Sequence, residues 1–399
     1  MTLGPGIGRT LLPQGFSCSG VNSGVRRYRP DLGIIISDRP SVVAGVFTQN
    51  QCKAAPILYC QKLLPSENIK AIVTNSGQAN SATGPEGLVN NLKMAGAAAE
   101  KLNCKPDQIL TASTGPIGVQ MEIGKIVDSM SELIDRQGVT AEAFALAILT
   151  TDLVPKTVST EVKLSGGRIQ ITGICKGSGM IHPNMGTMLG YFLTDAKLSV
   201  NEAVTTLKST TDKSFNMISV DGDSSTNDCA FIMANGKSGI GLQNEHDLLL
   251  FQKALDDVAI CLAKSIARDG EGATKLIEVQ LVGSPQEELA KLAARGLVMS
   301  PLVKTAIHGE DPNWGRILAR LGADQVPSVC LEKMSLSLQG TLVFDNGAPV
   351  KVDLQSIRTQ LKSDLVTIQV DLKSGPHQAT SWGCDLSKKY VEINAEYLT

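Results

Sequence analysis

The sequence predicts an α/β fold. Short apolar runs typical of buried strands alternate along the chain with longer segments in which apolar residues recur at a helical period. Hydrophobic residues make up 42% of the 399 residues and charged residues 19%, and glycine occurs 38 times, which is the composition of an ordinary soluble protein. This length allows a sizeable core and favours either two or three domains or one large layered unit.

Apolar runs bounded by turn residues predict the strands in the first half of the chain. The first two, 31–37 and 41–47, are separated by a polar turn with a proline, so we expect them to be neighbouring strands. A third strand is expected at 69–74. Residues 161–174 alternate between apolar and polar on both sides of a glycine pair, which predicts a hairpin with a two-residue turn.

Apolar residues spaced three or four apart predict the helices. The first helix is expected to bury one face, made of Leu88, Leu92, Ala95, Ala99 and Leu102. Further helices are expected at 123–134, 141–149, 200–215 and 251–266. Later strands are expected at 188–193, 229–234 and 275–283, and a hairpin at Asn346 and Gly347.

Charge and motifs argue against several classes of function. Lys and Arg total 37 against 39 for Asp and Glu, so a surface that binds nucleic acid or an anionic membrane has little support. The four histidines lack the spacing of metal ligands, so no metal is expected. No glycine motif has the context of a nucleotide-binding loop.

The cysteines and the N-terminal residues predict a cytoplasmic protein. Nine cysteines without a CxxC pair are typical of buried, reduced thiols. The first residues lack the charged start and apolar centre of a signal peptide, and no apolar run approaches the roughly 20 residues that span a bilayer.

Catalytic chemistry is predicted in the glycine-rich stretch KGSGMIHPNMGTMLGYFLTD, residues 176–195, in which Thr187 follows Gly186. If the chain were cut between these two residues, the Thr187 hydroxyl and its new α-amino group would form a nucleophile and a base on one residue. A terminal amine titrates near pH 7.7–8.0 and is partly neutral in the cell. Gly186 suits self-cleavage because it has no Cβ. By its local pattern alone, however, such a stretch is more often an ordinary turn before a strand.

Two further loops are candidates for a site of this kind. Thr114 and Gly115 precede the predicted helix 123–134, and amide groups near a helix start can hold an oxyanion. A loop that simply caps the helix is at least as frequent. Glu271 lies in a turn between glycines, where its carboxylate could recognise an amine, although a solvated turn is the commoner explanation.

Together these residues resemble a known family. KGSGMIHPNMGTMLGYFLTDA, with STGPIG before it, DGEGATK after it and WGCDL…INAEYLT at the C-terminus, is closely similar to the bacterial ornithine acetyltransferases, or glutamate N-acetyltransferases, of arginine biosynthesis. The similarity spans nearly the whole chain. It implies a layered α/β sandwich, N-terminal-nucleophile-like and similar to that of self-processing aminopeptidases, with a smaller C-terminal α/β subdomain at about 275–399.

The resemblance also implies an enzyme that cuts itself before Thr187 into an α chain, 1–186, and a β chain, 187–399. The two chains would assemble as an α2β2 heterotetramer. Thr187 would take the acetyl group of N2-acetylornithine as an ester and pass it to glutamate. No cofactor is implied. Some members of the family also use acetyl-CoA as a donor, so acetyl-CoA is a candidate co-substrate.

The site residues implied by the resemblance are spread along the chain. Thr114 and Gly115 stand at the oxyanion-hole positions. The substrate-binding positions are occupied by Thr150 and Thr151, of which either or both would contact substrate, and by Lys176, Thr187, Glu271, Asn394 and Thr399. Lys176 and nearby hydroxyls would bind the α-carboxylate that both substrates carry, and Glu271 would pair with the ornithine amine.

The chain departs from the family pattern in three places. Gly186 replaces the usual alanine, and Pro116 stands where valine is common, which removes one N–H from that loop. The loop containing Gln78, Ser81 and Ala82 differs from the usual NSGNANACTG. The alternative function is a related self-processing aminopeptidase or amidohydrolase, which would release the same acyl-enzyme to water. An inert binding protein with the same sequence features would remain uncut.

Overall fold

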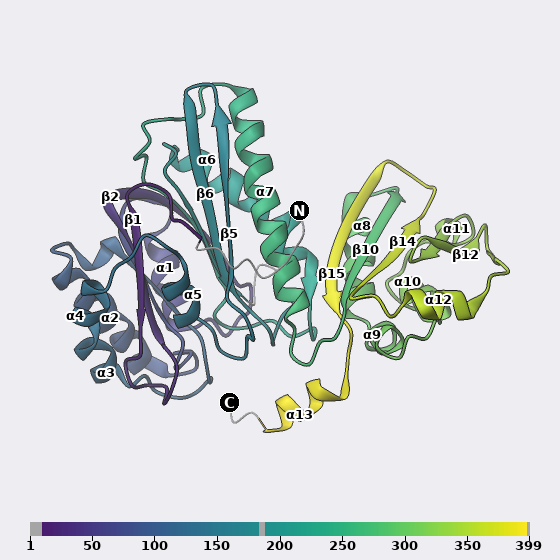
Figure 1. Ribbon diagram of the computed structural model, residues 1–399, viewed down its shortest axis with the longest axis horizontal. Coiled ribbons are helices and arrows are strands. Elements are labelled where there is room, and N and C mark those ends of the chain that lie inside the picture. Colours follow the sequence, from purple (N-terminus) through teal and green to yellow (C-terminus); the bar gives the residue numbers. More distant parts are fainter. Residues whose placement is uncertain (1–9, 183–187, 397–399) are drawn as a thin grey trace.

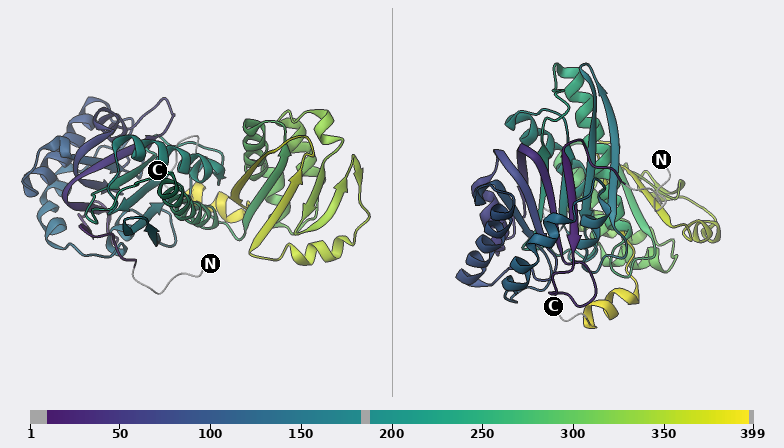
Figure 2. Two further views of the ribbon diagram at one scale, coloured as in Figure 1. Left: turned by 90° about the horizontal axis from the view of Figure 1, so that it is seen from above. Right: turned by 60° about the vertical axis from the view of Figure 1, so that its left-hand side comes forward.

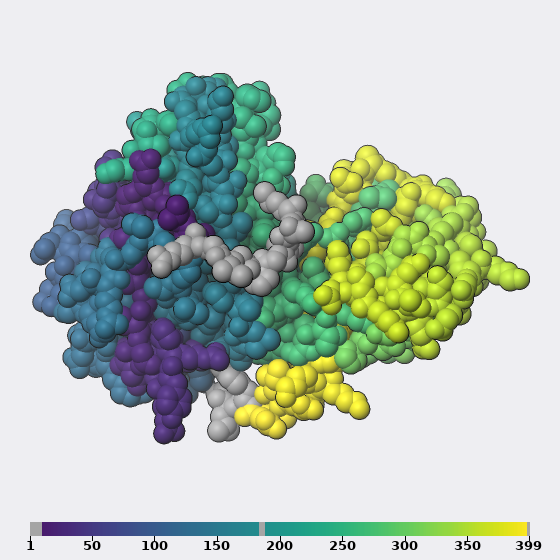
Figure 3. All heavy atoms as spheres, viewed as in Figure 1, coloured from purple at the N-terminus to yellow at the C-terminus, as the bar shows by residue number. Residues whose placement is uncertain are grey.

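The computed structural model describes residues 10–182 and 188–396. These residues form two β-sheets with helices packed against them, so the layered α/β fold predicted from the sequence is confirmed. Figure 1 shows the larger sheet and its helices on the left and the smaller sheet on the right. The space-filling view in Figure 3 shows the same two parts as separate lobes.

The larger sheet contains eight strands within the described residues. Seven run in the order β4–β3–β2–β9–β7–β6–β5, and β1 pairs with β2 outside this path. Their bounds are β1 Phe16–Val21, β2 Leu32–Phe47, β3 Ser66–Asn75, β4 Ile109–Ser113, β5 Lys156–Leu164, β6 Gly167–Lys176, β7 Leu189–Thr194 and β9 Cys229–Ala234. β7 and β9 are parallel, with Leu189 opposite Cys229, so the strand that follows the predicted nucleophile is a central one.

The first two predicted strands form a single element. β2 continues through Pro40, and its pairing with β3 shifts register between Ile36 and Ser41. The prediction that 31–37 and 41–47 are neighbouring strands is therefore wrong. A register irregularity can accommodate a proline, which has no N–H to donate, without reversing the chain.

The two faces of the larger sheet carry separate cores, because successive side chains of a strand point to opposite faces. Tyr191 and Leu193 of β7 pack with residues of α1 and α5, whereas Phe192 packs with residues of α6 and α7. Helices α2 to α4 pack with β1, β2 and β3 in a third core. The helices are α1 Ala55–Leu63, α2 Gly84–Lys101, α3 Ile123–Asp128, α4 Met130–Asp135, α5 Glu142–Ala147, α6 Val200–Lys213 and α7 Glu245–Arg268; a 3₁₀ helix, η1, covers Pro106–Gln108.

Helix α2 buries a different face from the one predicted. Ala95 and Ala99 are buried as expected, but Leu88 and Leu92 are 43% and 52% exposed. The helix instead turns Met94 and the small alanines inward, where they allow a close approach to the sheet. The predicted helix at 123–134 is divided at Ser129 into α3 and α4.

The smaller sheet contains seven strands of the described chain, in the order β13–β12–β11–β14–β10–β15–β8. The strands are β8 Ile218–Ser219, β10 Leu276–Ser284, β11 Ser335–Leu338, β12 Thr341–Asp345, β13 Ala348–Pro349, β14 Leu365–Asp371 and β15 His377–Cys384. The remaining helices are η2 Phe215–Met217, α8 Glu287–Met299, α9 Pro301–His308, α10 Gly315–Ala323, α11 Ser328–Leu331, α12 Leu354–Gln360 and α13 Lys388–Glu396. The predicted hairpin at Asn346 and Gly347 joins β12 to β13, and both residues have the positive φ that a tight turn requires.

Helices α7 and α13 and residues 219–228 lie where the two sheets meet. Figures 1 and 2 show α7 between the two sheets and α13 leaving the smaller sheet to lie below the region where they meet. β8 precedes β9 in the chain, yet it pairs with β15 in the smaller sheet. Residues 219–228 therefore run from the edge of one sheet to the middle of the other.

The nine cysteines, all in described positions, are free thiols. Six are buried, as the sequence predicted, but Cys52 is exposed and Cys104 and Cys261 are partly exposed. Across residues 10–182 and 188–396, no helix combines the length and the apolarity needed to cross a bilayer.

Phe144 of α5 offers a test of the core behind β7. Its ring is fully buried and stacks edge-to-face on Tyr191, with the ring centroids 5.0 Å apart. We expect Phe144→Ala to lower the free energy of unfolding by about 3–5 kcal/mol because it leaves a cavity. The measurement is a urea unfolding curve. Leu146→Ala, on the same helix but 46% exposed, is the control and should leave the curve nearly unchanged.

Candidate active site

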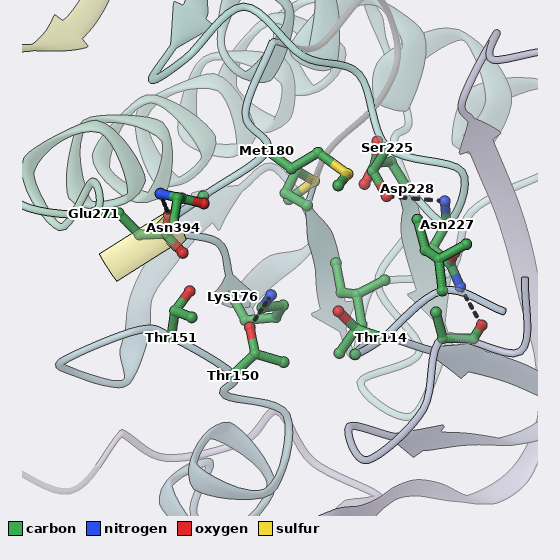
Figure 4. A pocket seen from close by; sticks show the side chains of 16 residues that line it. Thr114, Thr150, Thr151, Lys176, Met180, Ser225, Asn227, Asp228, Glu271 and Asn394 are labelled. Carbon is green, nitrogen blue, oxygen red and sulfur yellow. Dashed lines mark hydrogen bonds between the residues drawn. The ribbon is translucent and has the colours of Figure 1, made fainter. Parts of the chain in front are cut away.

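One pocket brings together most of the residues that the sequence singled out. It is lined by Thr114, Gly115, Thr150, Thr151, Lys176, Glu271 and Asn394. In Figure 4, Glu271 and Asn394 lie on one side of Lys176, and Thr114, Asn227 and Asp228 lie on the other. Gly186, Thr187 and Thr399 are outside the described residues, so their predicted roles stay predictions. Met188, which directly follows Thr187 in the chain, lines the same pocket.

Lys176 ends β6, and its ammonium group lies at the floor of the pocket. Its Nζ donates to Thr150 Oγ1 at 2.7 Å and lies 3.8 Å from Asp152 Oδ2. Lys176 is only 8% exposed and lines the pocket, so its positive charge faces the pocket and not the bulk solvent. A buried cation beside hydroxyl groups can bind a carboxylate through charge-assisted hydrogen bonds.

A second lysine, Lys156, forms ion pairs with carboxylates next to Lys176. Lys156 Nζ lies 2.8 Å from Asp152 Oδ1 and 2.6 Å from Asp269 Oδ2, and all three side chains are nearly or fully buried. The Asp152 carboxylate also accepts from the amides of Gly177 at 2.7 Å and Thr150 at 3.2 Å. Asp152 therefore fixes the backbone beside both Lys176 and Thr150, and we call Asp152, Lys156 and Asp269 the buried charge network.

The pKa of Asp152 follows from these contacts. Burial by itself would raise the pKa of this carboxyl group. The charges of Lys176 and Lys156, together with hydrogen bonds from Lys156 and Gly177, outweigh burial and lower the pKa well below its usual value. Asp152 is therefore ionised at neutral pH, and its charge compensates the two neighbouring ammonium groups.

Thr114 and Gly115 occupy a loop and not a helix start. Helix α3 begins only at Ile123, so the helix-terminus argument made from the sequence is wrong for these two residues. The Thr114 amide already donates to the Asn75 carbonyl at 2.9 Å. A contribution of Thr114 to an anion site would therefore come from its hydroxyl.

Glycine is needed at position 115. Its φ is +130°, and a Cβ there would lie 2.9 Å from the carbonyl of Gly77. This close contact is fixed by further bonds between the two loops, since Ala79 N–H donates to the Pro116 carbonyl at 3.1 Å and Gly118 N–H to the Ser81 carbonyl at 2.9 Å. The two loops, which contain Gln78, Ser81 and Pro116, thus pack on each other beside the pocket.

The opposite side of the pocket is acidic and includes the C-terminal helix. Asn394 of α13 donates to Glu271 Oε2 at 2.8 Å. The backbone of Gly179 lies directly against this carboxylate, because a Cβ on Gly179 would be 2.3 Å from the carboxyl carbon. Ser178 and Glu271 are joined by a backbone hydrogen bond of 3.0 Å. The pocket therefore presents an ammonium group and a carboxylate at two different places, as a zwitterionic or aminocarboxylate ligand would require.

Sequence reasoning missed three polar residues of the pocket, Ser225, Asn227 and Asp228. Asn227 Nδ2 donates to the carbonyls of Ala79 and Ser113, at 2.6 and 2.8 Å, and so holds the loop before Thr114. Burial raises the pKa of Asp228 well above its usual value, although Lys176 and hydrogen bonds from Ser225 and Met188 oppose this rise. All three lie at the end of a polar loop that precedes a buried strand. This position in the sequence could have identified them as candidate site residues.

The pocket residues offer hydroxyl, ammonium, carboxylate and amide groups. Within the described parts of the chain, no group of three or more His, Cys, Asp or Glu side chains is arranged to hold a metal ion. The hydroxyl, ammonium, carboxylate and amide groups can bind a charged small molecule, form hydrogen bonds and transfer protons.

Comparison with known proteins identifies close relatives. The sequence profile of the ArgJ family matches residues 17–399. The arginine biosynthesis bifunctional protein ArgJ of Lactococcus lactis is 44% identical over 392 residues, which cover 98% of this chain and 98% of that protein. The protein of the same name from Thermotoga neapolitana is 44% identical over 397 residues, covering 98% of this chain and all of the relative.

A solved structure of a protein with the same name is similar to this chain in both fold and sequence. The crystal structure of the arginine biosynthesis bifunctional protein ArgJ from Bacillus halodurans superposes with a TM-score of 0.51 and is 41% identical. The match covers 53% of this chain and the whole of the matched chain.

The buried charge network can be tested by Asp152→Asn. We expect a loss of about 3–5 kcal/mol in the free energy of unfolding at pH 7, because the change leaves Lys156 and Lys176 with one compensating carboxylate fewer. The folded-state pKa of Asp152 is lowered, so its stabilisation is present above about pH 4 and is lost as the pH falls further. Unfolding curves should therefore show a smaller difference in the free energy of unfolding between wild type and Asp152→Asn at pH 3 than at pH 7.

The control for this experiment is Asp257→Asn, which removes an exposed carboxylate paired with Lys253. An exposed pair contributes little, so this change should leave stability nearly unaltered at either pH. Equal effects of the two substitutions would contradict the importance of the buried charge network.

Proposed function

The chain belongs to the ArgJ family, and we infer that it is an acyltransferase of arginine biosynthesis. It transfers the acetyl group of N2-acetyl-L-ornithine to L-glutamate and gives L-ornithine and N-acetyl-L-glutamate. The observation that carries this assignment to individual residues is the meeting of Lys176, Glu271 and Thr114 in one pocket beside β7.

The two charged sides of the pocket support recognition of these substrates. Acetylornithine and glutamate share an α-carboxylate, and we assign it to Lys176 with the hydroxyl of Thr150 or Thr151. Acetylornithine also carries a side-chain amine, and we assign it to Glu271, whose carboxylate is oriented by Asn394. The C-terminal Thr399 remains a predicted contributor.

We propose that the nucleophile is Thr187 and that the chain creates it by self-cleavage. The Thr187 hydroxyl oxygen attacks the Gly186 carbonyl carbon, the C–N bond breaks, and an ester forms while the nitrogen becomes a free α-amino group. Water then hydrolyses the ester and releases the carboxylate of Gly186. The products are the α chain, 1–186, and the β chain, 187–399, with hydroxyl and amine together on Thr187.

Acetyl transfer follows the same pattern of bond making. The Thr187 oxygen attacks the acetyl carbonyl, the Thr187 amine takes the hydroxyl proton and delivers it to the departing ornithine nitrogen, and an acetyl ester remains. The glutamate amine then attacks this ester and restores the hydroxyl. The Thr114 hydroxyl and the Gly115 amide are assigned to the oxyanion that forms in each step. One shared ester predicts ping-pong kinetics.

The two remaining proposals concern donors and assembly. The relatives are named bifunctional, which supports acetyl-CoA as a second donor to the same threonine. Formation of acetylglutamate from acetyl-CoA and glutamate, without any ornithine derivative, would test this. We further propose that the α and β chains assemble as α2β2 in the cytoplasm and need no bound cofactor.

The related self-processing hydrolase differs only in the fate of the acyl-enzyme. Membership of the ArgJ family disfavours it. Acetylornithine supplied with and without glutamate separates the two activities, since a hydrolase would release acetate in both cases and a transferase would form acetylglutamate.

Thr187 carries the central prediction. The wild-type chain of 42.2 kDa should appear as two chains in intact-protein mass spectrometry. Thr187→Ala should remain one chain and show no acetylglutamate formation, because it removes the attacking hydroxyl, and without cleavage the nitrogen of residue 187 is not freed as an amine. Thr187→Ser keeps a hydroxyl and is the matched control, expected to be cleaved and active. An active wild-type protein that is a single intact chain would refute the proposal.

The oxyanion assignment makes a separate prediction. Thr114→Ala should lower kcat about 10²- to 10³-fold with a small effect on KM, because the hydroxyl would bind charge that develops only in the transition state. Steady-state kinetics with acetylornithine and glutamate provide the measurement. Thr114→Ser retains the hydroxyl and should stay within a few-fold of wild type. A loss confined to KM would assign Thr114 to substrate binding instead.

A further inference from the structure

Residues 219–228 contact the described residues that flank the predicted cleavage position in the sequence, 180–182 and 188. The segment starts at the end of β8 in the smaller sheet and ends where β9 enters the larger sheet. Both of its ends are thus fixed in a sheet. It contacts the chain on the N-terminal and on the C-terminal side of the predicted cleavage position.

On the N-terminal side, Asp221 holds two consecutive amides. Met180 N–H donates to Asp221 Oδ2 at 2.6 Å, and Ile181 N–H donates to Oδ1 at 2.8 Å. The Ile181 carbonyl accepts from the Val220 amide at 2.6 Å. Met180 has a φ of +55°, a left-handed conformation that costs energy for a residue with a side chain. The paired bonds to Asp221 compensate this cost and fix the direction of the backbone.

The next residue, His182, is held by three further contacts. Its carbonyl accepts from Ser224 Oγ at 2.7 Å, and its ring nitrogens lie 3.2 Å from Ser219 Oγ and from Arg295. Because a guanidinium only donates, His182 Nε2 accepts and Nδ1 carries the hydrogen. Burial and the Arg295 charge lower the pKa of His182 to about 4, so the ring is neutral at physiological pH. The ring is thus bound as one neutral tautomer.

On the C-terminal side, Asp228 and Cys229 hold Met188. The Met188 carbonyl accepts from the Cys229 amide at 3.1 Å, and Met188 and Asp228 line the same pocket. Burial raises the pKa of Asp228, and a hydrogen bond from the Met188 amide opposes this rise. Asp228 is 4% exposed, and its Oδ2 has no hydrogen-bond partner among the residues described. Met188, the first described residue after the predicted cleavage position, is therefore held by the end of the same segment.

We propose that residues 219–228 act as a processing clamp, which holds the chain on both sides of the Gly186–Thr187 bond so that self-cleavage can occur. Asp221 and Ser224 fix residues 180–182, and Asp228 fixes Met188. The inference rests on the self-cleavage proposed above and adds to it the residues that position the chain. These are positioning residues, since none of them is assigned to attack the bond.

The geometry gives the clamp a physical advantage. An intramolecular attack is fast only when the reacting atoms are held close and aligned, and ordering the chain beforehand can supply much of that acceleration. Both anchoring points belong to one short segment, so their separation is set by a piece of chain that is itself fixed in two sheets. Burial raises the pKa of Tyr390 on α13, and the Asp221 charge adds to this rise, which places the C-terminal helix close to the clamp.

The test is the rate of self-cleavage in the full-length chain, followed by intact-protein mass spectrometry at intervals after synthesis. Asp221→Asn leaves one acceptor oxygen for two amides, so we expect cleavage to slow about ten- to a hundredfold. Asp223→Asn removes the same charge from the same segment without touching the bonds to Met180 and Ile181, and it should be cleaved near the wild-type rate. Urea unfolding of each precursor shows whether slow cleavage accompanies a folded chain.

Two substitutions of Asp228 distinguish a role in holding the Met188 backbone from a role in proton transfer. Asp228→Asn keeps one oxygen to accept the Met188 amide and should be cleaved within a few-fold of wild type, whereas Asp228→Ala removes the acceptor and should slow cleavage strongly. Ser224→Ala, a milder change, should slow it by a smaller factor. Wild-type cleavage rates in Asp221→Asn and Asp228→Ala would overturn the clamp while leaving self-cleavage intact. An uncut wild-type chain would overturn self-cleavage itself.

Discussion

The pocket depends on the buried ammonium group of Lys156 between Asp152 and Asp269. Removing two carboxylates from water is costly, and only a charge placed between them and several donated hydrogen bonds can compensate for this. The compensation here ties two distant pieces of chain together: the segment from Asp152 to Lys156, which leads from α5 into β5, and the end of α7 at Asp269. Lys176 and Thr150 take their positions from this junction, so the binding charge of the pocket is set by residues that do not face it.

The sequence predicted which residues line the pocket better than it predicted the packing of the elements that carry them. Seven of the residues named from motif resemblance line one pocket, which requires loops from β4, β6 and α7 and the helix α13 to converge. Thr114, Gly115, Thr150, Thr151 and Glu271 sit in turns rich in glycine or hydroxyl groups, which are visible in the sequence, whereas Lys176 ends β6 and Asn394 lies in α13. The convergence itself is set by the pairing of β7 with β6 and β9, which no local pattern encodes.

The parts that could not be predicted have a common cause in tertiary packing. A polar stretch with proline suggested a reversal within β2, but neighbouring strands keep the chain extended through a register shift. The leucines at 88 and 92 suggested the inner face of α2, whereas the close approach of the helix to the sheet selects alanine and methionine. Asp152 and Asp228 looked like ordinary polar residues next to secondary structure. Their roles depend in part on Gly177 and Lys176, which lie more than 20 residues away along the chain, and only the folded chain reveals these partners.

The arrangement also explains why two sheets are needed for one small pocket. Thr114 and Lys176 belong to elements of the larger sheet, but Glu271 follows α7 and Asn394 follows the last strand of the smaller sheet. Lys176 and Glu271, the cation and the carboxylate that would bind opposite ends of a substrate, are therefore held by different parts of the molecule. Gly179 lies against Glu271 with no room for a side chain, so the spacing between the two parts is fixed at the pocket. A ligand that bridged Lys176 and Glu271 would therefore contact both lobes, and a shift at their junction would change the distance between its two binding groups.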